Sequence, residues 1–213
     1  MVDSVNNVTW PSTKANCSEV ATCGRGYYGN IVRYCSMSGE WYDPDTTYCV
    51  KGTYQDIADQ VRGINTSKEA EKIVDEIEKV ISLDKRTING GDLLKVIEIL
   101  DMILQKEPFM LEGDVGSKMN FSFVFVKIVS NMLDKRNEQR WQDIHRNKGV
   151  DKGTAAVFED LEKFDLAVSY FIQKYNLSIN LAHENIEYQA YWLSRGKKDM
   201  ETLRVEHEQQ SQE

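Results

Sequence analysis

All four cysteines of this chain fall between Cys17 and Cys49, and none occurs in the residues that follow. The same stretch is rich in tryptophan and tyrosine. A segment of about forty residues cannot bury enough apolar surface to be stable through its core alone, so it needs crosslinks or a bound metal. We therefore expect residues 1–52 to form a small crosslinked module, hereafter the module.

The cysteine spacing favours disulfides over zinc. Five, eleven and thirteen residues separate successive cysteines, and no CxxC pair places two thiolates on one tight turn, as zinc ligands commonly are. Two disulfides are expected, each contributing about 3 kcal/mol if it acts through chain entropy. Four cysteines allow three connectivities, and the spacing does not choose among them. We expect no metal and no cofactor.

Within the module, frequent glycines predict short strands joined by turns. The stretch from Ile31 to Cys35 alternates apolar and polar residues, as a half-buried strand does. The aromatic side chains of Tyr27, Tyr28 and Trp41 could form a ligand-binding patch. In so small a module we assign them to the core.

After Gly52 the apolar period changes from two residues to 3.6, which predicts helices. We interpret the segment Asn89-Gly90-Gly91 as a helix breaker and Asp92 as the N-cap of a central helix that is apolar nearly all round. Five or six helices are expected to pack as antiparallel neighbours. Their expected positions are Tyr54 to Gly63, a helix capped by Thr66 and Ser67, Leu93 to Lys106, Phe121 to Leu133, a short turn at Trp141 to Ile144, and Thr154 to Lys174.

Beyond Asn176 the pattern changes again. Ile186, Tyr188, Ala190 and Trp192 alternate with polar residues and predict a strand. No partner for this strand is evident, so we interpret it as the first strand of a truncated β subdomain, followed by a charged tail over residues 196–213.

The pattern C-x-x-G-x-x-G-x-x-x-R-x-C-x-x-x-G-x-W, which runs from Cys23 to Trp41, resembles the hormone-receptor (HormR) domain of adhesion G-protein-coupled receptors. The module resembles that of the latrophilins in particular. This resemblance implies first-to-third and second-to-fourth disulfides, Cys17–Cys35 and Cys23–Cys49. Gly24 stands where the family usually has a proline.

The helical part resembles subdomain A of the GAIN (autoproteolysis-inducing) domain of the same receptors. The segments GDLLKVIEILDMIL, WQDIH and AAVFEDLEKFDLAVSYFI carry this resemblance. The two resemblances together imply an α+β chain with three parts. These are a HormR module (1–52), an all-α GAIN subdomain A (53–180), and the start of a truncated β subdomain with a polar tail (181–213).

Charge and hydropathy narrow the possible partners. The net charge of −8 offers no basic face for nucleic acid or for an anionic membrane surface. No apolar run is long enough to span a bilayer, and the start of the chain does not read as a secretory leader. Disulfides imply an oxidising compartment, so we expect the extracellular face of the plasma membrane. Contact with the membrane would come only through the seven-helix region that the resemblance implies.

Five Asn-x-Ser/Thr sequons support a secreted location, because this motif accepts N-linked glycans in the secretory pathway. Their asparagines are Asn7, Asn16, Asn65, Asn120 and Asn176.

No catalytic constellation is evident. His145, His183 and His207 lie in polar surroundings without a second ligand at metal spacing. Full GAIN domains cleave themselves at a His-Leu/Ser-Thr step, which is absent here, so we expect no enzymatic activity. We expect a non-enzymatic link between ligand-binding modules and the autoproteolytic core, with an extracellular protein or the rest of the GAIN domain as partner. The alternative is a free-standing secreted binding or inhibitory protein.

Overall fold

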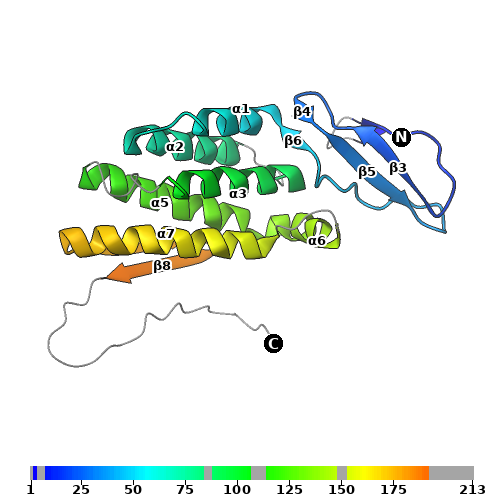
Figure 1. Cartoon of the computed structure of the whole chain (residues 1–213). Coiled ribbons are helices and arrows are strands. Elements are labelled where there is room, and N and C mark those ends of the chain that lie inside the picture. Colours follow the sequence, from blue (N-terminus) through cyan, green and yellow to red (C-terminus); the bar gives the residue numbers. More distant parts are fainter. Residues whose placement is uncertain (1, 4–7, 84–87, 107–113, 148–152, 192–213) are drawn as a thin grey trace, which may run out of the picture.

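The computed structural model describes residues 2–3, 8–83, 88–106, 114–147 and 153–191. In Figure 1 the helices stack in layers, the module projects from one end of the stack, and a C-terminal strand lies along its outer surface. No helix in the described part of the chain combines the length and hydropathy that a membrane span needs.

The module is built from three short antiparallel pairs of strands. The predicted strand at Ile31 to Cys35 is confirmed, and it pairs with Cys17–Thr22 so that Cys17 faces Cys35. The pairs are β1 (Val2–Asp3) with β2 (Val8–Thr9), β3 (Cys17–Thr22) with β5 (Asn30–Cys35), and β4 (Tyr27–Tyr28) with β6 (Val50–Lys51).

The module core differs from the one predicted. It consists of Val8, Trp10, Ile31 and Cys49. Tyr28 is 64% exposed, so its assignment to the core was wrong. Tyr27 and Trp41 are half-buried, and the alternation along the two-residue strand β4 leaves Tyr28 at the surface.

The helices follow the predicted pattern, except that the fourth begins at Val115 and not at Phe121, because the Asp114 side chain caps it by accepting the Ser117 amide. They are α1 (Gly52–Val61), α2 (Ser67–Leu83), α3 (Gly90–Leu104), α5 (Val115–Met132), α6 (Glu138–Arg146) and α7 (Thr154–Tyr175), with a 3₁₀ turn η1 (Lys135–Asn137) before α6. A capping box opens α2: the Glu69 amide donates to the Thr66 hydroxyl at 3.3 Å, and the Thr66 amide donates to the Glu69 carboxylate at 3.0 Å.

The central position expected for the third helix is confirmed. α3 packs against α1 on one side and α7 on the other. Its side chains are buried on several faces, as its apolar sequence requires: Leu93, Val96, Ile97, Ile99, Leu100 and Ile103. However, α3 begins at Gly90, so Asp92 lies inside the first turn and the prediction of Asp92 as the N-cap was wrong.

The predicted solitary strand has a partner. β7 (Ser178–His183) and β8 (Ile186–Tyr191) form an antiparallel hairpin. It packs on α5 and α7 and contributes Ile179, Leu181 and Ala190 to the helical core. The hairpin is therefore covered on one face by the helices. Trp192 and the charged tail lie outside the described residues.

Two polar contacts fix the hairpin on the helices. The Tyr188 hydroxyl donates to the Asp165 carboxylate at 2.7 Å. Burial, with the nearby carboxylate, raises the pKa of Tyr188 well above its usual value. At the turn, the Asn185 amide group donates to the Ser130 carbonyl of α5 at 2.9 Å.

Candidate functional site: the joint between module and helices

The module and the helices meet without a linker, and we call the contact region the joint. β6 pairs with β4 of the module, and α1 begins at the next residue, Gly52. The Gly52 amide still donates to the carbonyl of Gly26 at 2.9 Å. The last strand of the module and the first helix are therefore one continuous element.

Thr46 of the module caps α3. The first amides of a helix have no partner within the helix, and a side-chain oxygen usually satisfies one of them. The N-cap Asn89 makes no such bond. Instead, the Gly90 amide donates to the Thr46 hydroxyl and the Gly91 amide to the Thr46 carbonyl, both at 3.0 Å. Because Thr46 is fully buried, these bonds are shielded from water.

Two glycines let α3 approach the module this closely. A Cβ placed on Gly91 would lie 2.3 Å from the carbonyl oxygen of Cys49, and one on Gly90 would lie 2.9 Å from the Cα of Thr47. Both neighbours are backbone and cannot move aside easily. The predicted helix breaker is thus a contact surface for the module, a function that one sequence alone does not reveal.

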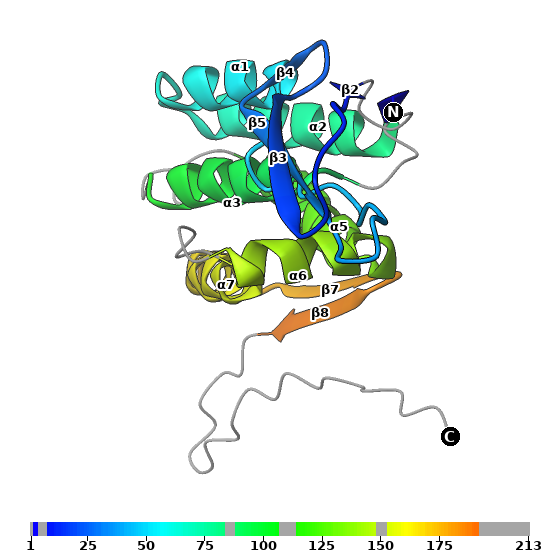
Figure 2. The ribbon, with the colours of Figure 1, turned by 90° about the vertical axis from the view of Figure 1, so that its right-hand side faces the viewer.

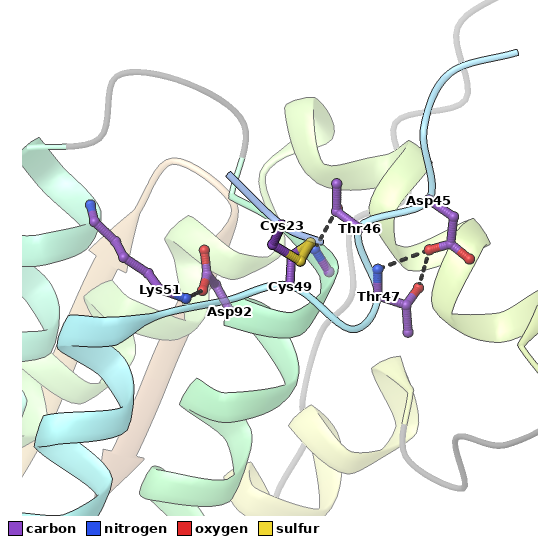
Figure 3. The surroundings of a disulfide bond; sticks show 8 residues. Cys23, Asp45, Thr46, Thr47, Cys49, Lys51 and Asp92 are labelled. Atoms are coloured by element: carbon purple, nitrogen blue, oxygen red, sulfur yellow. Dashed lines mark hydrogen bonds between the residues drawn. A yellow bond between two sulfur atoms is a disulfide. The ribbon is translucent and has the colours of Figure 1, made fainter. Parts of the chain in front are cut away.

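Asp92 of α3 contributes a further contact to the joint (Figure 3). Its buried carboxylate accepts the Lys51 amide at 2.6 Å, where β6 leads into α1. A carboxylate in the first turn also complements the positive end of the helix dipole. α3 therefore contacts the module through backbone amides and through this carboxylate.

The disulfide holds the loop on which α3 rests. Cys23 and Cys49 are joined, with their Cα atoms 5.8 Å apart, and the carbonyl of Cys49 is the group that Gly91 faces. Asp45 stabilises the preceding turn by accepting the Thr47 amide at 2.8 Å. The Cys23–Cys49 bond thus supports both the module and the joint, as Figure 3 shows.

The second expected disulfide is not formed in the structure. Cys17 is an exposed free thiol and Cys35 a buried one. They are nevertheless direct cross-strand partners on β3 and β5. Of the two disulfides that the resemblance implies, the structure contains Cys23–Cys49 and does not contain Cys17–Cys35.

A second contact joins the module to α6. The Tyr48 hydroxyl donates to the Asn147 side-chain oxygen at 2.8 Å, and the Arg140 guanidinium donates to the Pro44 carbonyl at 3.0 Å. Burial raises the pKa of Asp143 on the same helix, and the negative charge of Asp45 adds to this effect. The module is therefore held at two separate helices.

The glycan acceptors that the structure describes lie on different elements: Asn16 before β3, Asn65 before α2, Asn120 on α5 and Asn176 at the end of α7. Asn16 and Asn176 are exposed and have positive φ angles of 63° and 51°. Asn65 is exposed in the loop before α2, and its amide group donates to the Gly63 carbonyl at 3.0 Å. Asn120 donates to Glu71 across α2 and α5 at 2.8 Å. Asn7 lies outside the described residues.

The histidines are dispersed. His145 is exposed on α6, and the ring of His183 lies 4.9 Å from that of Phe123. His207 lies outside the described residues. Within the described ranges, no group of three or more metal-ligating side chains comes together.

Comparison with known families assigns the helical part to a family. The GAIN family model described as "AGRL2-4 GAIN subdomain A" matches residues 54–169, from the start of α1 to near the end of α7. The chain belongs to the GAIN subdomain A family.

More distant similarity extends into the module. Cadherin EGF LAG seven-pass G-type receptor 2 of Homo sapiens is 20% identical over 197 residues, which cover 89% of this chain and 7% of that protein. Adhesion G protein-coupled receptor B3 of Mus musculus is 23% identical over 76% of this chain and 11% of its own length. Latrophilin-like protein 1 of Caenorhabditis elegans is 25% identical over 44% of this chain and 10% of its own length. The chain thus spans about a tenth or less of the length of these curated relatives, and it is related to adhesion G-protein-coupled receptors.

Proposed function

We propose that this chain belongs to the extracellular region of a latrophilin-like adhesion G-protein-coupled receptor. The module would be a HormR domain, placed directly before GAIN subdomain A. Its role would be non-enzymatic: it would connect ligand-binding modules to the autoproteolytic part of the receptor. Membership of the GAIN family and the module's pattern of glycines, cysteines and tryptophan support this proposal.

The observation that carries the proposal is the joint. A connector transmits force or orientation only if its two parts cannot rotate independently, and flexible linkers do not meet this condition. Here β6 continues into α1, and Thr46 caps a helix of the other part. The joint therefore has the construction of a rigid connector.

The partners follow from this role. We propose an extracellular protein ligand, or the remaining GAIN subdomain, as the binding partner. The negative net charge does not favour nucleic acid.

Rigidity of the joint can be measured as a distance distribution. Spin labels at Met37 of the module and Leu83 of α2, which are 82% and 72% exposed, report the orientation of the two parts. We expect one narrow distribution in the wild type and a broad one in Gly91→Ala, because the added Cβ collides with the Cys49 backbone. Gly153→Ala is the matched control, since a Cβ there meets nothing within 4 Å. A broad wild-type distribution would contradict the proposal.

The consequence for signalling needs the full receptor. Inserting a flexible Gly/Ser segment between Lys51 and Gly52 separates β6 from α1 and removes the constraint that the Gly52–Gly26 hydrogen bond places on α1. We expect the insert to change the response to ligand engagement. An unchanged response would mean that the joint is a passive tether.

The HormR assignment has its own test. We propose that Cys17 and Cys35 become a second disulfide in secreted protein, because they face each other across β3 and β5. Non-reducing peptide mapping should recover a Cys17–Cys35 crosslinked peptide beside the Cys23–Cys49 one. Two free thiols in secreted material would count against this pairing.

A further inference from the structure

We propose that Asn16 carries an N-linked glycan whose first sugars cover an exposed aromatic face of the module. This inference rests on the proposed function, because N-linked glycans are added in the secretory pathway. The face lies on the β3–β5 hairpin, which projects toward the viewer in Figure 2.

The outer face of this hairpin exposes several apolar side chains among polar ones. Strand alternation turns Ile31 and Cys35 inward and leaves Tyr34 outward. Tyr42 stacks on Tyr34, with ring centroids 5.6 Å apart and an interplanar angle of 28°. Tyr42 is 60% exposed and Val20, on the neighbouring strand, 62%. The outer faces of these rings and the Val20 side chain leave apolar area in contact with water, which a further apolar group could cover.

Asn16 lies at the edge of this face. The Tyr34 hydroxyl donates to the side-chain oxygen of Asn16, which places the amide group beside the aromatic ring. The backbone of Asn16 is fixed as well, since its amide donates to the Ser36 carbonyl at 3.2 Å. The side-chain nitrogen of Asn16 donates no hydrogen bond to the described residues. It is therefore exposed beside the rings that a sugar would cover.

The rest of the sequon is equally accessible. Ser18, whose hydroxyl completes the Asn16-Cys17-Ser18 motif, is exposed and lies directly opposite Tyr34 on the adjacent strand. The Asn120 sequon differs, because Phe121 and Ser122 are buried and the Asn120 amide group is bonded to Glu71. The folded structure accommodates a glycan at Asn16 and disfavours one at Asn120.

The chemistry requires only a standard donor. The side-chain nitrogen of Asn16 forms a bond to the anomeric carbon of N-acetylglucosamine while that carbon's bond to a lipid diphosphate breaks. The lipid diphosphate leaves, and the amide loses one proton. The C–H face of the attached sugar can then pack on Tyr34 and Tyr42, which removes apolar area from water.

The test uses the whole chain secreted from a eukaryotic cell line. Mass spectrometry of glycopeptides measures the occupancy of Asn16, with Asn65 and Asn176 as internal markers of passage through the secretory pathway. Ser18→Ala removes the glycan without altering Asn16, and Ser18→Thr keeps the sequon. The thermal midpoint of Ser18→Ala is then compared with that of the wild type, and the same comparison is made in the Tyr42→Ala background. The same variants produced without glycans show how much of the difference comes from the Ser18 substitution itself.

We expect Asn16 to be occupied, and loss of its glycan to lower the thermal midpoint by about 2–4 °C when Tyr42 is present and by less in Tyr42→Ala. An unmodified Asn16 in protein that carries glycans at Asn65 or Asn176 would overturn the inference and leave the proposed function intact. Equal shifts in both backgrounds would overturn the contact with the rings. Absence of glycan at every sequon would contradict the passage of this chain through the secretory pathway, and with it the proposed function.

Discussion

The module and the helical part are stabilised in different ways. The helices share one continuous apolar cluster that extends from Tyr54 to Ala190, whereas the cluster among the described residues of the module is small and consists of Val8, Trp10, Ile31 and Cys49. The module compensates with a disulfide and with the surface that it shares with α3. A small domain can therefore be ordered by its neighbour as much as by its own core.

Truncating the centre of the helical part should have the largest effect. Leu100 is 2% exposed on the central helix, so Leu100→Ala leaves a cavity and should cost about 2–5 kcal/mol. Chemical denaturation followed by circular dichroism measures the loss. The control Glu98→Ala, on the same helix but partly exposed, should stay within about 0.5 kcal/mol. An unchanged midpoint for Leu100→Ala would show that α3 is peripheral.

Removing the disulfide tests the module. The Cys23–Cys49 bond joins residues 26 positions apart, and its loss through Cys23→Ser with Cys49→Ser should cost about 3 kcal/mol. The four-residue core cannot offset this loss. We expect hydrogen exchange to show loss of protection in β3 and β5 while α5 keeps it. Equal loss in both parts would mean that the two unfold as a single unit.

Removing the cap tests the surface that the two parts share. Thr46→Val keeps the shape of the side chain but leaves the buried Gly90 amide without its hydroxyl acceptor, which should cost about 1–2 kcal/mol. Denaturation of the whole chain measures it. Thr22→Val, at an exposed strand position, is the matched control. Equal effects of the two changes would argue that Thr46 does not cap α3.

The smallest effect concerns a cap inside the helical part. Hydrogen bonds hold the pKa of Glu69 below its usual value of 4.5; the bond from the Asn65 amide has the largest effect, and the bond with the Thr66 side chain comes second. Because the folded pKa is lowered, the contribution of Glu69 is present above the unfolded pKa and is lost as pH falls through the folded one. Thermal midpoints from neutral pH to about pH 3 should therefore decline less steeply in Glu69→Gln than in the wild type. Identical slopes would mean that Glu69 does not contribute through its charge.

The sequence predicted those elements whose signal is local. The helices were found because their apolar residues recur every three to four positions, and α2 was placed by the cap expected at Thr66 and Ser67. β5 was found by alternation. The partner of β8 was missed, because Ser178 to His183 become a strand through pairing with β8 and packing on α5 and α7. Asp92 was misassigned because the residue that caps α3, Thr46, lies far away in the chain.

The sequence by itself therefore determined a cysteine-rich β module followed by a set of amphipathic helices. Local periodicity, capping residues and the position of the cysteines suffice for that conclusion. Only the tertiary structure decided how the two parts meet: that Gly90 and Gly91 are contact positions, that Thr46 caps a helix in the other part, and that Asp92 binds the strand leading into α1. Each of these contacts joins residues more than forty positions apart, and no local pattern records which distant backbone will approach a glycine.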